Sequence, residues 1–227
     1  MTHSVNYTTY LHKVPILSKL KEEELELLLE GGRTKIFPKN SVVFNEGDLE
    51  DGLYIVLSGK AKAILMDPEG RELTLSVFGP GDFLGEMAIF DEQPRSATIE
   101  TIEETTFLVL PKETVHSLIR RNPTIAIAML TELSLRLREA DDKIRTLAYY
   151  DVAGRLARIL IDLLKKEGKV VKQKNIAYVK LPPRQDLANM VGASRETISR
   201  VLSSLQRRGV ISVTRNHLVI HNVSELL

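Results

Sequence analysis

The chain has 227 residues, enough for two modest domains with hydrophobic cores of their own. It contains no cysteine, which excludes disulfides, iron–sulfur clusters and cysteine-based zinc sites, and no apolar run approaches the ~18 residues of a membrane span. The N-terminus lacks the basic and apolar segments of a secretion signal. We therefore expect a cytoplasmic protein that does not bind membranes.

The net charge of +1 hides two regions of opposite charge. Residues 151–227 carry 14 Lys and Arg against 6 Asp and Glu, a net charge of +8, whereas residues 1–150 carry 17 against 24, a net charge of −7. A basic C-terminal third predicts a domain that binds a polyanion, next to a domain with another role. A chance distribution of surface charge is the alternative.

The first half of the chain changes from one helical segment to many short strands. Residues 17–31 are rich in Leu and Glu and are ended by the pair Gly31-Gly32, which predicts a short acidic amphipathic helix. From residue 33 to about 110, short β-branched and apolar runs alternate with turn signals, a pattern typical of an antiparallel β-roll or barrel. The predicted strands are Val42–Phe44, Leu53–Leu57, Ala61–Leu65, Leu73–Phe78, Ala97–Thr101 and Thr106–Leu110.

Within this region, residues 78–101 contain a candidate anion site. Gly85 lets the backbone approach a ligand closely, Arg95 supplies a planar charged fork for a phosphate, and Ser96 adds a hydroxyl donor. Glu86 cannot bind phosphate but can accept a hydrogen bond from a sugar hydroxyl. The combination therefore suits a sugar phosphate such as a cyclic nucleotide. A buried Glu86–Arg95 ion pair without any ligand would explain the same residues.

From Lys112 to Tyr150 the apolar spacing becomes helical. Apolar residues recur at spacings of four and three, the heptad pattern of a coiled coil. We therefore predict a long helix that forms a homodimer through residues 126–147, because its opposite face is strongly polar; a helix packed on its own domain is the alternative. The apolar seam comprises Ala126, Leu130, Leu133, Leu137, Ala140, Ile144 and Leu147, and the polar face comprises Arg136, Arg138, Glu139, Asp142 and Lys143.

The remainder of the chain has the pattern of a winged helix-turn-helix. Asp151 can cap a helix over Val152–Glu167, and the basic residues 169–180 predict a loop with a strand. Two further strands, Val210–Val213 and Leu218–His221, predict the hairpin of the wing, with Arg215 between them placed to contact phosphate.

The helix-turn-helix itself lies between these elements. A short helix, Arg184–Val191, stops at Gly192, and a second helix begins near Ser194 and ends near Arg207. The second helix presents Arg195, Glu196 and Arg200. Arg donates two hydrogen bonds to guanine and Glu accepts one from the amino group of cytosine, so residues that read bases lie where a recognition helix reaches base edges. A solvated amphipathic hairpin is the alternative.

Five motifs carry a resemblance that extends over nearly the whole chain: EGD (46–48), GLYIVLSGKAKA (52–63), FGPGDFLGEMAIFDEQPRSAT (78–98), LAYYDVAGRLA (147–157) and VGASRETISRVL (191–202). Together they resemble the Crp/Fnr superfamily of bacterial transcription regulators, most closely its cyclic-AMP receptor branch. The resemblance implies an α+β protein in three parts. These are an N-terminal antiparallel β-roll of the jelly-roll, cyclic-nucleotide-binding type (1–111), a dimerisation helix and hinge (112–150), and a C-terminal winged helix-turn-helix (151–227).

The resemblance also implies a function and its residues. The protein is expected to be a ligand-responsive regulator of transcription, with cyclic AMP as effector and no metal, that binds double-stranded DNA and contacts RNA polymerase. The ligand shifts the dimer toward a conformation whose recognition helices lie about 34 Å apart, on an inverted repeat of TGTGA-like half-sites. The implied ligand contacts are Gly85, Glu86, Met87, Arg95, Ser96, Ala97, Ala140 and Asp141, and the implied DNA contacts are Ser194, Arg195, Glu196, Thr197, Arg200 and Arg215.

One departure from the family concerns the effector. The cyclic-AMP receptor places a Thr-Ser pair against adenine, where this chain has Ala140 and Asp141. A hydroxyl both donates and accepts, whereas a carboxylate only accepts, which suits the two adjacent N–H donors of guanine better than adenine. Cyclic AMP is the leading effector, and cyclic GMP, cyclic di-GMP or no nucleotide are the alternatives.

Functions of other classes are less consistent with the residues. A hydrolase could use Glu86 with Asp91 or Glu92, but Arg95 nearby would lower the carboxyl pKa values and remove the general acid. The histidines do not cluster as a haem site would require. A DNA-binding structural protein whose β-roll only supports the dimer is the third alternative.

Overall fold

The computed structural model describes residues 17, 22–49, 52–167, 169–171, 176–214 and 217–221. The chain divides into two compact units, the first formed by residues 1–65 and 74–137 and the second by residues 66–73 and 138–227.

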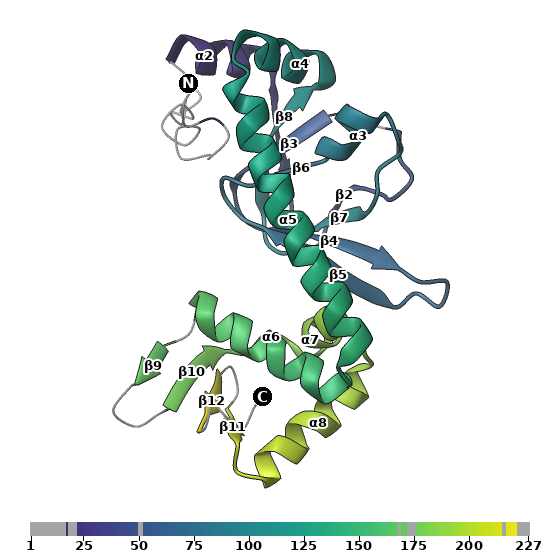
Figure 1. Ribbon diagram of the computed structural model, residues 1–227, viewed down its shortest axis with the longest axis vertical. Coiled ribbons are helices and arrows are strands. Elements are labelled where there is room, and N and C mark those ends of the chain that lie inside the picture. The colour runs from purple at the N-terminus through teal and green to yellow at the C-terminus, as the bar shows by residue number, and fades with distance from the viewer. Residues whose placement is uncertain are drawn as a thin grey trace. The chain divides into compact units, whose positions relative to one another are not determined.

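Two four-stranded antiparallel sheets form the β-roll (Figure 1). The central strand β3 (Gly52–Ser58) reads GLYIVLS, and its residues 53–57 are buried on both faces, because their side chains alternate between two cores. Tyr54 and Val56 belong to an aromatic core that includes strands of both sheets, whereas Leu53 and Ile55 face helices. One sheet has the order β1 (Arg33–Phe37), β8 (Thr105–Pro111), β3 (Gly52–Ser58), β6 (Phe83–Leu84), and the other β2 (Val42–Phe44), β7 (Thr98–Thr101), β4 (Ala61–Met66), β5 (Glu72–Phe78). The six predicted strands are confirmed, while β1 and β6 were not predicted.

Helices cover the outer face of the sheet that contains β3. They are α2 (Glu22–Gly31), α4 (Lys112–Arg121) and α5 (Thr124–Tyr149), and they contribute Leu25, Val115 and Met129 to the shared core. The helical period predicted from Lys112 onward is thus divided between two helices. The break falls at Asn122 and Pro123, where proline has no N–H for helix α4 to use and the Asn122 side chain accepts from the Thr124 N–H at 3.2 Å.

Helix α5, the long teal helix of Figure 1, has two different apolar faces. Ile125 and Met129 are buried in the core of the first unit. The apolar seam lies on another face, where Leu130, Leu137 and Ile144 are 58%, 64% and 65% exposed. Packing on its own domain therefore occupies one side of the helix and leaves the seam uncovered in the single chain.

The second unit contains the winged helix-turn-helix. Its core joins α6 (Val152–Glu167), α7 (Arg184–Val191) and α8 (Arg195–Arg207) to a sheet. The predicted cap is confirmed, since the Asp151 carboxylate accepts from the Gly154 N–H at 2.8 Å. Residues 169–180 hold two paired strands rather than the one predicted, and the sheet order is β11 (Ile211–Val213), β12 (His217–Ile220), β10 (Ile176–Lys180), β9 (Lys169–Val171).

Candidate functional site

Gly85 and the short helix after it carry the predicted anion site. Helix α3 (Glu86–Asp91) was not predicted; it begins directly after Gly85, which has a left-handed backbone with φ of 80°. A Cβ at this position would overlap the Nη1 of Arg95 and lie 2.9 Å from the carbonyl oxygen of Gly52. Only glycine therefore allows the backbone to turn into α3 while the Arg95 guanidinium lies against it.

Arg95 is buried within the aromatic core of the β-roll. Its side chain is only 3% exposed, and it donates through Nη1 to the Gly85 carbonyl at 2.7 Å and through Nη2 to the Gly52 carbonyl at 2.9 Å. The guanidinium lies 4.2 Å from the centre of the Phe44 ring. A buried cation is costly unless it is hydrogen-bonded, and these contacts supply that compensation.

The EGD motif holds the backbone on either side of this guanidinium. The Arg95 N–H donates to the Asp48 carbonyl, and the Gly47 N–H donates to the Arg95 carbonyl, both at 2.9 Å. A segment more than forty residues away in the sequence thus fixes the position of Arg95. The motif has a structural role in the site, which the sequence pattern alone did not reveal.

Glu86 forms its ion pair with a residue that the sequence analysis placed elsewhere. The Glu86 carboxylate lies 3.3 Å from Nη1 of Arg136, whose Nη2 donates to the Phe83 carbonyl at 2.7 Å. The Arg136 guanidinium also stacks 4.5 Å from the centre of the Phe83 ring. The sequence analysis counted Arg136 among the residues of the polar face opposite the seam, but its side chain is only 21% exposed and points into the β-roll. The available signal was its spacing of seven residues from the buried Met129.

The electrostatics of Glu86 reflect burial between two cations. Burial raises the pKa of the Glu86 carboxyl, while Arg136 and, more weakly, Arg95 oppose that rise. The alternative of a Glu86–Arg95 ion pair does not describe the main contacts, because the Glu86 carboxylate pairs with Arg136 and Arg95 donates to backbone carbonyls. The site places an acceptor for hydroxyl groups beside a buried cation in an aromatic environment.

The other predicted ligand residues divide into two groups. Ser96 is exposed and donates to the Met87 sulfur at 3.4 Å, and Ala97 is buried in the aromatic core, so these three residues lie around the same cluster. Ala140 and Asp141 have exposed side chains on α5, beyond the end of the first unit at residue 137. Their contact with a ligand stays a prediction.

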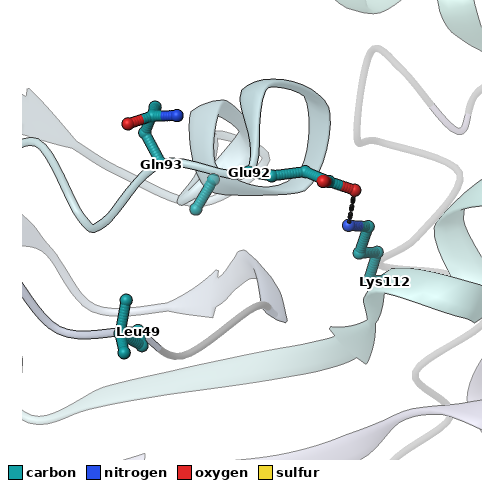
Figure 2. A pocket seen from close by; sticks show the side chains of 5 residues that line it. Leu49, Glu92, Gln93 and Lys112 are labelled. Carbon is teal, nitrogen blue, oxygen red and sulfur yellow. Dashed lines mark hydrogen bonds and ion pairs between the residues drawn. The ribbon is translucent and has the colours of Figure 1, made fainter.

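A separate pocket opens at the other end of α3. It has a volume of about 280 Å³ and is lined by Leu49, Ala88, Glu92, Gln93 and Lys112 (Figure 2). The Lys112 amine lies 2.7 Å from the Glu92 carboxylate and lowers the pKa of that group. The pocket contains none of the predicted ligand contacts, and a Glu92 carboxyl with a lowered pKa is a poor general acid.

The predicted DNA-reading residues lie on one exposed side of α8. Ile198, Leu202 and Leu205 are buried and fix the helix on the domain. Ser194 is the N-cap and accepts from the Thr197 N–H at 3.2 Å, so its hydroxyl has a local structural role. Arg195, Glu196 and Arg200 are exposed, Thr197 is half-buried, and Arg215 lies outside the described residues.

Two further properties bear on the predicted cofactors and partners. Within the described ranges, no group of three or more His, Cys, Asp or Glu could hold a metal ion. Among the helices that the structure describes, none has the length and apolarity needed to cross a membrane.

Comparison with known proteins covers both units. Residues 34–122 match the family described as "Cyclic nucleotide-binding domain", and residues 154–227 match the "Crp-like helix-turn-helix domain". The chain is 36% identical over 198 residues to the cyclic AMP receptor protein of Thermus thermophilus, covering 87% of this chain and 88% of the relative. It is 34% identical over 190 residues to a CRP-like cAMP-activated global transcriptional regulator of Mycobacterium tuberculosis, covering 84% of each.

A solved structure is similar over almost the same extent. It is that of the c-di-GMP responsive global regulator CLP of Xanthomonas campestris, with a TM-score of 0.78 and 31% identity, covering 89% of this chain and 100% of that one.

Proposed function

The chain belongs to the Crp/Fnr family of transcription regulators, and from this premise we propose that cyclic AMP, bound in the β-roll, controls its affinity for DNA. Its relatives regulate transcription, so the protein is a DNA-binding regulator and the hydrolase alternative is wrong. We take residues 1–111 as the effector domain, 112–150 as dimerisation helix and hinge, and 151–227 as the DNA-binding domain.

Two buried residues of opposite charge, Glu86 and Arg95, are the main observation that supports this proposal. Glu86 and Arg95 are 6% and 3% exposed; the Arg95 guanidinium lies against the Phe44 ring, and the Glu86 carboxylate lies 3.3 Å from Arg136. A ribose hydroxyl donates to the first and a cyclic phosphate accepts from the second, so one small ligand uses both charges. Gly85, Met87, Ser96 and Ala97 complete the proposed contacts. The names of the two curated relatives favour the adenine nucleotide.

A guanine nucleotide is the second candidate, and two observations favour it. Asp141 offers only acceptors, which suit the adjacent N–H donors of guanine. The similar solved structure is of a regulator responsive to c-di-GMP. Asp141, together with Ala140, is therefore the proposed determinant of the base.

The proposed active form is a homodimer through residues 126–147. In the single chain, the seam residues Leu130, Leu137 and Ile144, which are spaced seven residues apart, are each more than half exposed. Soluble helices bury such a seam against a second helix, and a two-fold axis brings the same surface from another copy.

The dimer then reads a two-fold symmetric operator. We propose that Arg195, Glu196 and Arg200 contact base edges of a TGTGA-like half-site, with Ser194, Thr197 and Arg215 near the phosphates. The nucleotide controls this step only if it binds the operator-competent dimer more tightly than the other state. Contact with RNA polymerase is also proposed, on the basis of the family.

Calorimetric titration of the nucleotide-stripped protein with cyclic AMP, cyclic GMP and cyclic di-GMP tests the effector. We expect cyclic AMP to bind most tightly and to raise affinity for a TGTGA inverted repeat. Asp141→Ser, which restores a hydroxyl, is the matched variant and should strengthen cyclic AMP binding. Preference for a guanine nucleotide that disappears in Asp141→Ser would support the second candidate, and no binding of any nucleotide would contradict both.

A further inference from the structure

The first turn of α6 is connected on both sides within the second unit. On one side the Asp151 carboxylate accepts from the Gly154 N–H at 2.8 Å, and the Arg158 guanidinium lies 4.8 Å from the centre of the Tyr150 ring. These contacts join α6 to Tyr150 and Asp151, the two residues between α5 and α6. Gly154 packs closely there, since a Cβ would lie 3.0 Å from the Tyr150 ring.

On the other side, Arg155 reaches the turn of the helix-turn-helix. Its Nη2 donates to the carbonyl oxygen of Gly192 at 3.4 Å. Gly192 ends α7 with a left-handed backbone, φ of 68°, and is separated from the cap of α8 by one residue. A cation at this place is favourable, because the last carbonyls of a helix carry partial negative charge.

The surroundings of the Arg155 side chain restrict the orientation of its guanidinium group. Its Nε is buried and, among the described residues, has no hydrogen-bond partner. Burial of one guanidinium nitrogen and donation by another orient the group toward the Gly192 carbonyl.

We propose that Arg155 is a positioning residue for the recognition of DNA bases. This proposal rests on the proposed function of α8 as the recognition helix. It holds the turn between α7 and α8 against the first turn of α6 and thereby sets the direction in which Arg195, Glu196 and Arg200 enter the major groove. Arg155 acts through Gly192 and does not itself contact a base.

A direct phosphate contact by Arg155 predicts a different result. Loss of a phosphate contact weakens binding to all sequences alike and lowers the slope of log K against log salt by about 0.9. Loss of a positioning residue lowers the preference for the operator over unrelated DNA and leaves the salt slope and non-specific affinity unchanged.

The experiment compares Arg155→Met with Arg158→Met in the full-length, effector-saturated protein. Both variants keep an aliphatic stem and remove one positive charge from the same helix, but Arg158 stacks on the Tyr150 ring, whereas Arg155 donates to the Gly192 carbonyl. Fluorescence anisotropy measures affinity for the operator and for scrambled DNA over a salt series. We expect Arg155→Met to reduce the operator preference about tenfold, with Arg158→Met close to wild type.

Arg155→Lys is the second variant, because it keeps charge and a donor and should fold even if Arg155→Met does not. It should retain the preference to within about threefold of wild type. The proposal is overturned by equal loss on both DNAs, by a lowered salt slope, or by a folded Lys variant as unselective as Arg155→Met. If wild type shows no operator preference, the proposed function fails instead.

Discussion

The two candidate sites of this protein place their charges in opposite environments. In the β-roll, Glu86 and Arg95 are almost fully buried, and their partners come from β3, α5 and the loop before β3. In the helix-turn-helix, Arg195 and Arg200 are exposed, and the helix that carries them is fixed by its own cap and apolar face. Substitution in the first site should therefore change folding and binding together, whereas substitution in the second should change binding alone.

The apolar seam of α5 is exposed, like the residues of the helix-turn-helix, and a substitution in it should have the largest effect of those considered, on dimerisation. Leu137→Glu places a charge in the proposed interface twice, once from each copy, so we expect dimerisation to weaken by about 3 kcal/mol or more. Stability of the single chain should hardly change, because Leu137 is 64% exposed. Leu135→Glu is the control, since Leu135 is 53% exposed on the same helix but lies off the seam. Equal dissociation of both variants in analytical ultracentrifugation would contradict the interface.

Gly85→Ala tests the coupling of fold and ligand in the buried class. The new Cβ must displace the Arg95 guanidinium, so effector affinity should fall about 100-fold, or about 2.7 kcal/mol. The free energy of unfolding should also fall, because alanine is strained at a positive φ. Gly70→Ala separates these effects, since Gly70 has φ of 78° with nothing within 4 Å of a Cβ. An equal loss of ligand affinity in Gly70→Ala would show that steric displacement of Arg95 is not the cause.

Arg195→Ala tests the exposed class directly. It should cost about 1–3 kcal/mol of operator affinity and relax the preference at one base pair. The unfolding free energy should stay within about 0.5 kcal/mol of wild type, because the side chain is exposed. Arg207→Ala, at the other end of α8, is the control for charge. Uniform weakening across all base substitutions in a binding-site scan would assign Arg195 to phosphate instead.

The pH dependence of stability should show the smallest effect. It tests whether burial or the neighbouring cations dominate the pKa of Glu86 in the buried site. Burial raises the pKa of Glu86 above its ordinary value of 4.5, so the folded protein binds that proton more tightly than the unfolded chain. Protonation therefore favours the folded state, and wild type should lose stability relative to Glu86→Gln as pH rises above 4.5 through the raised pKa. Urea unfolding of both proteins between about pH 4.5 and pH 7 measures the difference. A wild type that instead gains stability relative to Glu86→Gln would mean that Arg136 outweighs burial.

Local patterns in the sequence determined most elements and the exposed reading surface. Short β-branched and apolar runs between turn signals identify six strands of the β-roll, and the apolar side of α8 recurs at the helical period of about 3.6 residues. Gly192 and Ser194 mark the turn by their conformational and capping preferences. Arg195, Glu196 and Arg200 could be selected from the sequence because they belong to one helix.

The tertiary structure alone decided how the buried charges are paired and where α5 is covered. The short β6 and α3 have too few residues to show a periodic pattern of apolar residues, so the sequence did not predict them. In the structure they lie on either side of Gly85, whose backbone packs against Arg95. Arg136 looks like a surface residue on its helix, and only the approach of α5 to the β-roll places it 3.3 Å from Glu86, fifty residues away. The partner of a buried charge is the oppositely charged or polar group that lies near it in the folded chain, because electrostatic interactions are stronger in the low dielectric of the protein interior. The local sequence does not encode that distance.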